Sequence, residues 1–384
     1  MKKIGIHEPV FIGNEKKYLL ECISSNWVSN KGKFLNLFEK KIKNFTKSKY
    51  VIPVLNGTIG LHISMIVCGV KENDEVIVPS ISFISPINAI KYVGADPIFM
   101  DVDANCNIDQ DKCIDFIKNE TFFKNKKTFN KKTKKRIKAL VIIHCFGNAA
   151  NFSKLAPLCK RRNIKIIEDA AESLGTYYKD GKLKLKHTGT LGNTGVISFN
   201  GNKIVTSGNG GAILTQNSSL YKKCKYLINQ AKDDSVKFKH NSIGFNYSLS
   251  NLSAALGTAQ LEKIYFFLKK KKKIHEYYKF LFKNNKNFKL IKGPKYSKNN
   301  YWLNLLKIEN KKLQKKFEKK FYNSKIQLRP VWFPNHLQKP YLNAQKYKIS
   351  NANIIFKSLV CLPSSVNLEK KNLKQIANYI IKSG

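Results

Sequence analysis

The sequence predicts an α/β protein, in which helices cover a mostly parallel sheet, followed by a smaller α+β unit. Between residues 51 and 216, short runs of continuous apolar residues alternate with stretches of helical periodicity. Strands that are apolar on both faces are typical of parallel sheets with helices on either side. After about residue 286, short strands and helices mix. We therefore expect a large domain over residues 1–250, and a linking helix with a small domain over residues 251–384.

Each element follows from a local pattern. Two helices are expected first, at Glu15–Ile23 and Lys33–Phe45, because their apolar residues recur at helical spacing. The elements expected next are a strand from Val51, a helix after Thr58, strands at 74–80 and 96–103, helices at 85–94 and 109–119, a strand at 139–144, a helix at 153–162, and strands at 164–167, 194–199 and 212–216. Residues 120–136 are expected to be an exposed basic insertion.

The carboxyl-terminal part is expected to begin with helices. Residues 244–285 carry small and apolar residues at helical spacing, and the lysine run 269–273 is interpreted as a solvated helix face. Short strands are expected at 302–308 and 359–363, and helices at Lys311–Tyr322 and Leu368–Ile381. This mixture predicts a small α+β domain.

The charge of the chain is unusual, with 70 Lys and Arg against 25 Asp and Glu and a formal net charge of +45. Nucleic-acid binding is the obvious interpretation of such an excess. Only four of the basic residues are arginines, however, namely Arg136, Arg161, Arg162 and Arg329. Proteins that read bases and phosphates favour the bidentate fork of arginine. The lysines are also spread over the whole length, so we expect solvated surfaces rather than a nucleic-acid partner.

The cysteines and the hydropathy pattern exclude further classes. The eight cysteines form no C-x-x-C pair and no metal-ligand spacing, and Cys68, Cys145 and Cys361 lie in apolar runs, as reduced core residues do. The first residues lack the apolar region of a signal peptide, and no uninterrupted apolar stretch reaches the length of a membrane span. We expect a soluble cytoplasmic protein without a membrane partner or a metal site.

Polar residues follow several of the predicted strands directly. Asn56, Ser80, His144 and Asp169 each come just after an apolar run. In open α/β sheets, ligands bind beyond the carboxyl ends of the strands. Asn56 also stands with two small residues before a helix, an arrangement that can bind an anion. These positions together predict a ligand site at one edge of the sheet.

The stretch from Ile164 to Leu214 predicts which ligand. Asp169 ends an apolar run, Ser198 stands five residues before Lys203, and the glycine-rich turn SGNGG follows. An amine among apolar and small neighbours loses its proton readily, as a Schiff-base lysine requires. A carboxylate against a pyridine nitrogen keeps that nitrogen protonated. We interpret Lys203 as the lysine that binds pyridoxal phosphate, Asp169 as the partner of the ring nitrogen, and Ser198 as a phosphate ligand.

On these residues the chain resembles the pyridoxal phosphate-dependent sugar aminotransferases of the DegT/StrS type, from about Trp27 to Pro363. The similarity rests on blocks in the same order, which are WVSNKGKFLNLFEK, LNGTIGLH, DEVIVPSISFISPINAIKYVGADPIFMDVD, HCFGN, IEDAAESLGTYY, GVISFNGNKIVTSGNGG, GFNYSLSNLSAALGTAQL, RPVWFPNH and CLPSS. FNGNK, HTGTLG and residues 107–136 are most similar to the branch that acts on UDP-4-keto-6-deoxy-N-acetylhexosamines in pathways of the legionaminic acid type.

The resemblance implies fold type I, with a mostly parallel sheet of the seven-stranded type in the large domain. It also implies a homodimer with a shared active site, glutamate as the amino donor, and a role in making sugars for surface glycans. Lys203 and Asp169 are implied to be catalytic. The cofactor-binding residues are implied to be Gly57, Thr58, Phe83, Asp169, Glu172, Ser198, Lys203 and, from the partner subunit, Asn246. The residues implied to contact the sugar nucleotide are Trp27, Ser29, Lys31, His144, Arg329 and His336. Without the resemblance, the sequence favours Phe83 as a core residue over a residue that stacks on a flat ring.

Two positions depart from the family pattern. The usual T-G-E-G-G reads SGNGG, with Asn209 at the acidic position, and the arginine of N-Y-R is Ser248. Neither change removes a catalytic group. Two alternatives stay open: a pyridoxal phosphate-binding regulatory protein of the same fold, and an aminotransferase for a 3-keto sugar or a non-sugar ketone. Retention of Lys203 argues against the regulatory alternative.

Overall fold

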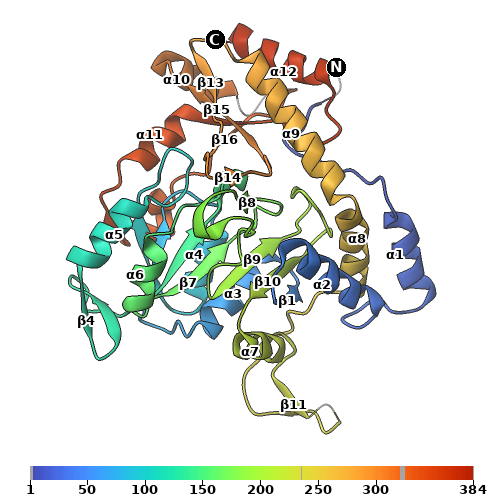
Figure 1. Cartoon of the computed structure of the whole chain (residues 1–384), viewed down its shortest axis with the longest axis vertical. Helices are drawn as coiled ribbons and strands as arrows, with labels where there is room; N and C mark the ends of the chain where they lie inside the picture. Colours follow the sequence, from blue (N-terminus) through green and yellow to red (C-terminus); the bar gives the residue numbers. More distant parts are fainter. Residues whose placement is uncertain (1–2, 235, 321–324, 384) are drawn as a thin grey trace.

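An eight-stranded sheet forms the centre of the protein in the computed structural model, which describes residues 3–234, 236–320 and 325–383 (Figure 1). Its strands, in spatial order, are β1 (Tyr50–Val54), β10 (Gly211–Thr215), β9 (Thr194–Ser198), β7 (Lys165–Asp169), β6 (Ile137–Ile143), β2 (Glu75–Pro79), β3 (Asp96–Met100) and β17 (Gln345–Tyr347). All neighbours from β9 to β17 are parallel, and β10 alone runs against both of its neighbours. The predicted fold class, a mostly parallel sheet in an α/β protein, is therefore confirmed.

Alternate residues of the strands enter two different cores. Val76 and Val78 of β2 belong to a core that includes α4 (Ser85–Tyr92), whereas Ile77 belongs to the core of α5 and α6. This is the period-two alternation of a strand with both faces covered. The remaining helices of the large part are α1 (Glu15–Ser24), α2 (Lys33–Thr46), α3 (Gly57–Val67), α5 (Gln110–Asn119), α6 (Leu155–Arg161) and α7 (Ser218–Ile228).

The expected exposed insertion at 120–136 is partly wrong. It contains a hairpin of β4 (Thr121–Lys124) and β5 (Lys127–Asn130), in which Thr128 and Asn130 are buried. The Asn130 amide donates to the Glu75 and Gln345 side chains, at 2.8 and 2.7 Å. These hydrogen bonds fix the hairpin to the sheet, and the polar composition of the segment does not reveal them.

A second, antiparallel sheet forms the smaller unit at the top of Figure 1. Its strands are β13 (Phe288–Leu290), β15 (Asn304–Ile308), β18 (Leu359–Leu362) and β16 (Arg329–Pro330), in that order. Its core lies against α9 (Ile264–Leu281), α10 (Lys311–Lys320) and α12 (Lys370–Ser383), while α8 (Asn251–Glu262) leads into α9. Residues 321 and 322 of the expected helix ending at Tyr322 lie outside the described residues.

The interpretation of residues 269–273 as a solvated face needs a correction. Four of these lysines are exposed, but Lys271 is completely buried. Its Nζ donates to the backbone carbonyls of Trp302 and Ser364, at 2.7 and 2.5 Å. These carbonyls offset part of the cost of burying an amine, and burial lowers the pKa of Lys271 well below its ordinary value. A run of like residues cannot reveal which member faces inward.

Segments far apart in the sequence join the two parts of the molecule. β17 comes from the carboxyl-terminal half but extends the large sheet, and Ile4 pairs with Ile326 of the smaller unit. Asp101, just after β3, accepts hydrogen bonds from the first backbone N–H groups of α11 (Asn351–Ser358). The smaller unit is thereby fixed above the carboxyl ends of the large sheet.

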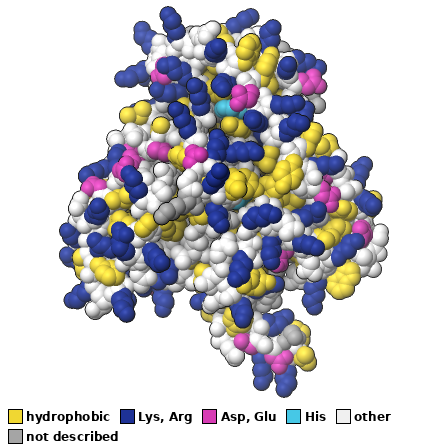
Figure 2. Space-filling model, viewed as in Figure 1, with side chains coloured by type: hydrophobic (Ala, Val, Ile, Leu, Met, Phe, Trp, Pro, Cys, Tyr) yellow, Lys and Arg dark blue, Asp and Glu magenta, His cyan; other side chains and the backbone are white. Residues whose placement is uncertain are grey.

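Apart from Lys271, the basic residues and the cysteines lie where the sequence predicted them. Lys and Arg side chains are spread over the visible face from the smaller unit to the hairpin of β11 (Lys232–Asp234) and β12 (Lys239–His240) (Figure 2). All eight cysteines are buried free thiols. Within residues 3–234, 236–320 and 325–383, no helix has both the length and the apolar character to cross a membrane.

Candidate active site

A cavity of about 290 Å³ lies where the carboxyl ends of β1, β7 and β9 meet the smaller unit. These three strands point in the same direction, so the residues that follow them converge. The lining residues are Asn56, Gly57, Thr58, Leu61, Phe83, Ser85, Ile143, Asp169, Ala171, Glu172, Ser198, Asn200, Asn202, Lys203, Asn209, Trp302 and Trp332. A larger, mostly apolar groove of about 1020 Å³ beside α6 contains none of the predicted site residues.

One end of the cavity is built to receive an anion. The Asn56 side chain caps α3 by accepting from the Ile59 N–H at 2.9 Å, and Gly57 and Thr58 open that helix. The first backbone N–H groups of a helix have no partner within it and attract negative charge. The Ser198 side chain, at the end of β9, lies against Gly57 on the same side.

Asp169, the last residue of β7, places its carboxyl group in the cavity. The residue is buried, with 7% of its surface exposed. Its Oδ1 accepts from the Ala171 N–H at 3.0 Å. Burial raises the pKa of Asp169, and the Ala171 N–H and the charge of Lys203 oppose that rise. Such a carboxylate is stabilised further when a protonated group binds beside it.

Lys203 enters the cavity from the turn after β9, with 14% of its side chain exposed. Its Nζ lies 3.9 Å from Oε1 of Glu172 and 4.0 Å from the centre of the Trp302 ring. Burial lowers the pKa of Lys203, while the carboxylates of Glu172 and Asp169 oppose the shift. An amine in this setting exchanges its proton more readily than a surface lysine.

Glu172 is held by the chain on two sides. Its Oε2 accepts from the Phe146 N–H at 2.6 Å, and its Oε1 accepts from Trp332 Nε1 at 3.2 Å. Burial raises the pKa of Glu172 to about 7, against the effects of Lys203 and the Phe146 N–H. Glu172 can therefore hold a proton near neutral pH beside the Lys203 amine.

Phe83 lies at the mouth of the cavity, 52% exposed, with its ring 5.3 Å from that of Trp332. The interpretation of Phe83 as a core residue is thus wrong. Asn209, which replaces the usual acid, lines the same cavity.

Glu168, just before Asp169, points away from the cavity and is completely buried. It accepts hydrogen bonds from His144 Nε2 and from the N–H groups of Gly189, Leu191 and Gly192, at 2.6 to 2.9 Å. Burial raises the pKa of Glu168, but the hydrogen bonds from His144 and the backbone outweigh it and hold this pKa below its usual value. Glu168 is a structural anion beneath the site.

This arrangement corrects the role expected for His144. Its ring is completely buried, Nε2 lies 2.9 Å from Glu168, and Nδ1 accepts from the Ala150 N–H at 3.1 Å. The structure does not support contact between His144 and a substrate, because both ring nitrogens are occupied inside the protein. Its position after a strand suggested the cavity, but the side chain points elsewhere.

Replacement of Glu168 by glutamine should lower the free energy of unfolding by about 2–3 kcal/mol at pH 7, because a buried amide then faces N–H donors. The depressed pKa of Glu168 adds stability above the unfolded-state pKa, and this contribution is lost as the pH falls through the folded-state value. Urea denaturation at pH 7 and at about pH 4 should therefore show that the free energies of unfolding of wild type and Glu168→Gln differ less at the lower pH. Glu369→Gln, at an exposed position, is the control; equal stability of Glu168→Gln and wild type at pH 7 would contradict this role.

Three other predicted residues lie near the cavity without lining it. His336 is buried, and its Nδ1 lies 2.6 Å from the Ser80 hydroxyl. Arg329 is exposed and lines a small neighbouring cavity of about 10 Å³, which shares Trp302 and Trp332 with the main one. Ser80, expected at the site, is bound instead to His336.

The remaining predicted residues are exposed and lie outside the cavity of their own chain. Trp27, Ser29 and Lys31 form the loop between α1 and α2, which Asn251 holds through the Trp27 and Ser29 carbonyls. Asn246 is exposed on the segment between β12 and α8 and pairs with Asn229, just after α7. The hairpin of β11 and β12, which precedes this segment, projects below α7 in Figure 1. These four residues face solvent in a single chain.

Two aromatic residues that wall the cavity were not among the predicted site residues. Trp302 and Trp332 come from the smaller unit and close the cavity above Lys203. Trp332 lies within the block RPVWFPNH, which pointed to this region, whereas nothing local distinguishes Trp302 from an ordinary core residue. Only the packing of the two parts reveals its place.

Pyridoxal phosphate fits these groups. Its phosphate suits the N-terminus of α3 beside Thr58 and Ser198, its ring nitrogen suits the Asp169 carboxylate, and its aldehyde suits the Lys203 amine. A Cβ at Gly57 would lie 3.1 Å from Cβ of Ser198, so glycine keeps this end of the cavity open. The Phe83 ring stands at the mouth, where it can face a flat ligand.

Comparisons with known proteins agree with this site. The model of the DegT/DnrJ/EryC1/StrS aminotransferase family matches residues 11–381. GDP-perosamine synthase of Escherichia coli O157:H7 is 34% identical over 91% of this chain and 89% of that protein. The enzyme of the same name from Vibrio cholerae is 31% identical over 98% of both chains.

A solved structure supports the fold. The aminotransferase TlmJ of Streptoalloteichus hindustanus superposes with a TM-score of 0.88 over 99% of this chain and 98% of that one, at 23% identity. Aminotransferases of the matched family use pyridoxal phosphate, the cofactor that the cavity fits. This chain therefore belongs to the DegT/DnrJ/EryC1/StrS aminotransferase family and is a pyridoxal phosphate-dependent transaminase.

Proposed function

We propose that this protein moves an amino group from glutamate to the 4-keto group of a 6-deoxy sugar nucleotide, in the cytoplasm. The observation that carries the proposal is the Lys203 amine, buried in one cavity with the Asp169 carboxyl and an anion-binding helix terminus. Pyridoxal phosphate, when bound, supplies the electron sink that makes a carbon acid out of an amino acid. The chain supplies binding, orientation and proton transfer.

Each residue has a defined task in this proposal. Asp169 keeps the pyridine nitrogen protonated, and Gly57, Thr58 and Ser198 bind the phosphate. Phe83 faces the ring, and Glu172 lies beside the Lys203 amine.

Lys203 is also the base that moves the reacting proton. In each half-reaction its Nζ takes a proton from one carbon of the reacting system and gives one to another. It would take the proton from the α-carbon of the amino donor in the first half-reaction, and give one to the carbon of the second substrate in the second. A placed base of this kind accelerates a reaction by about 10²–10⁴-fold. The wall of Trp302 and Trp332 limits the access of water to that proton.

We also propose that two copies of the chain share each active site. Among the described residues that line the cavity, Lys203 is the single basic one, although the cofactor, the donor and the sugar nucleotide are all anions. The hairpin of β11 and β12 and the residues after it, next to Asn246 in the sequence, expose the apolar side chains of Val236, Phe238 and Ile243. A partner subunit that docks there would cover these side chains and bring Asn246 to the phosphate.

The nucleotide is the finer part of the proposal. The resemblance of FNGNK, HTGTLG and residues 107–136 to one branch of the family favours a UDP-linked N-acetylhexosamine, whereas the two similar enzymes are named for a GDP-linked product. Trp27, Ser29, Lys31, Arg329 and His336 remain the proposed contacts of the sugar nucleotide. Arg329, exposed beside the main cavity, suits a diphosphate.

Replacement of Gly57 by valine should weaken the affinity for pyridoxal phosphate by at least about tenfold, which corresponds to 1.4 kcal/mol. The new side chain would meet Ser198 and occupy the end of the cavity where the phosphate is proposed to bind. The measurement is a titration of the cofactor-free protein with pyridoxal phosphate. Gly201→Ala is the control, since a Cβ there has no neighbour within 4 Å; unchanged affinity in Gly57→Val would move the phosphate elsewhere.

The proposed function is tested by the visible absorption of the cofactor-loaded protein. Glutamate should bleach the yellow band and yield 2-oxoglutarate. The bleached enzyme is then mixed separately with four candidate acceptors. These are the UDP- and GDP-linked forms of a 4-keto-6-deoxy sugar, a 3-keto sugar nucleotide and a simple ketone. Return of the yellow band with one 4-keto nucleotide identifies the substrate, whereas return only with the 3-keto sugar or the ketone would contradict the proposal.

A further inference from the structure

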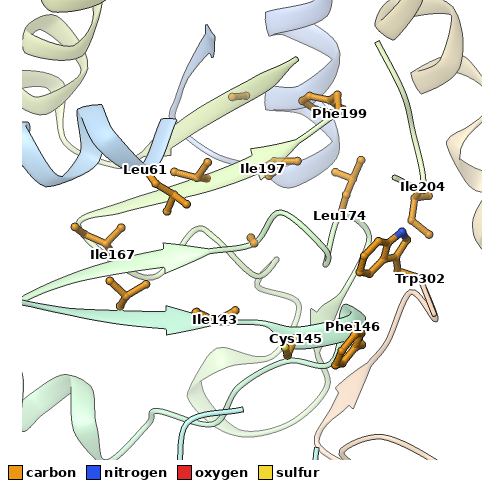
Figure 3. Close-up of a cluster of buried hydrophobic side chains, with 14 of the residues drawn as sticks. Leu61, Ile143, Cys145, Phe146, Ile167, Leu174, Ile197, Phe199, Ile204 and Trp302 are labelled. Carbon is orange, nitrogen blue, oxygen red and sulfur yellow. The ribbon is translucent and has the colours of Figure 1, made fainter. Parts of the chain in front are cut away.

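The indole of Trp302 faces the reacting amine directly. Nζ of Lys203 lies 4.0 Å from the centre of the Trp302 ring, closer than the other lysine–aromatic contacts of the described residues, which measure 5.0 to 5.9 Å. Both side chains are shielded from water, with Trp302 1% exposed. Figure 3 shows the indole beside Ile204, immediately after Lys203 in the sequence, at the end of the sheet where Phe146 also lies.

Three hydrogen bonds hold Trp302, one through its ring and two through its backbone. Its Nε1 donates to the carbonyl of Asn202, the residue before Lys203, at 2.7 Å. The backbone N–H of Trp302 donates to Asn300 at 2.8 Å, and its carbonyl accepts from the buried Lys271 at 2.7 Å. Trp302 is therefore tied both to the smaller unit and to the turn that carries Lys203.

Two further aromatic rings pack around Trp302. Phe146 and Trp332 each stack beside Trp302 with ring centres 6.4 Å apart. Trp332 also donates to Glu172, whose other oxygen is held by the Phe146 N–H. The Lys203 amine thus lies between a fixed aromatic face and a fixed carboxyl group.

We propose that the indole face of Trp302 stabilises the protonated form of Lys203 between its two proton transfers, which makes Trp302 a catalytic residue. The inference rests on the proposed role of Lys203 as the base. The face of an indole carries negative charge density, and it attracts an ammonium group most strongly where water is excluded. Glu172, 3.9 Å from Nζ, acts on the same cation.

The proton balance explains why this stabilisation is needed. The neutral amine accepts one proton from the α-carbon of the donor and becomes an ammonium group. It then gives one proton to the carbon at the other end of the reacting system and becomes neutral again, with no net change. Between the two transfers a cation exists in a cavity that disfavours charge, as the lowered pKa of Lys203 indicates.

If Trp302 served only to pack the core, its replacement would have a different effect on Lys203. The residue belongs to the main core cluster, so any truncation leaves a cavity and costs stability. A packing role does not require an aromatic face at Nζ, and it leaves the acidity of Lys203 unchanged. The pKa of Lys203 therefore separates the two roles.

The test measures that pKa in the cofactor-free protein, by competitive acetylation as a function of pH with peptide mass spectrometry. In Trp302→Leu the acid dissociation constant of Lys203 should rise by about 10- to 30-fold, the size of a shielded cation–π contact. Trp302→Phe should show a smaller rise, because it keeps an aromatic face. Phe288→Leu, which truncates a buried ring in the core of the smaller unit, should show none.

The kinetics supply a second measurement. Trp302→Leu should slow the maximal rate of the half-reaction with glutamate by about tenfold, with little change in the glutamate concentration that gives half of this rate. An unchanged Lys203 pKa in folded Trp302→Leu, or equal shifts in the Leu and Phe variants, would overturn the inference. The pKa of Lys203 is measured without turnover. Failure of this inference can therefore be distinguished from failure of the proposed function.

Discussion

Replacement of Lys203 by alanine should abolish transamination while the fold and the binding of pyridoxal phosphate persist. The amine is the proposed attachment point of the cofactor and the base that moves the reacting proton. Base catalysis alone accounts for about 10²–10⁴-fold of the rate, and loss of the amine also removes the exchange of the cofactor between lysine and substrate. We expect turnover to fall by at least about 10³-fold.

The fold should tolerate this change because burial of an amine costs free energy that alanine does not. Circular dichroism and thermal denaturation check the fold, and dialysis distinguishes loosely held from attached cofactor. Lys138→Ala is the control, since Lys138 is also partly buried with a lowered pKa but does not line the cavity. Added methylamine should restore part of the half-reaction in Lys203→Ala; wild-type turnover in this variant would show that Lys203 is not the base.

The order of strands and helices in the large part could be read from the sequence because apolar runs and helical periodicity are local signals. The expected strand at 164–167 proved to be β7, which extends to Asp169, and the expected strand at 139–144 begins two residues earlier, at Ile137. The convergence of Asn56 and Asp169 also followed from the rule for parallel sheets. The order and type of these elements required no distant contacts, whereas their exact ends and the reversed direction of β10 did not follow from the local pattern.

Features that depend on distant contacts could not be predicted. Residues 345–347 join the large sheet as β17, so the sheet has eight strands rather than the seven expected for its type. The burial of Lys271 depends on carbonyls at Trp302 and Ser364, and the direction of His144 depends on Glu168. No local pattern encodes such partners. The division of the chain near residue 250 and the shared active site stay predictions.

Replacement of Asp169 by asparagine is expected to have the second-largest effect, a loss of about 10²–10³-fold in the rate of the half-reaction with glutamate. Asparagine is nearly isosteric, and its side-chain oxygen can still accept from the Ala171 N–H. It carries no charge, so the ring nitrogen of the cofactor loses the partner that keeps it protonated, and the electron sink weakens. Rapid-mixing absorption of the loaded protein measures the rate.

The matched control is Asp101→Asn, because Asp101 also follows a strand of the large sheet. Its carboxylate accepts from the N–H groups of Ser350, Asn351 and Ala352 and pairs with Lys112, outside the cavity. Burial raises the pKa of Asp101, but the hydrogen bonds from Lys112 and from these backbone N–H groups outweigh it and lower the pKa to about 2.

Asp101→Asn should therefore lose stability at neutral pH but keep its half-reaction rate, whereas Asp169→Asn should keep stability and lose the rate. The same rate in Asp169→Asn as in wild type would remove Asp169 from the mechanism.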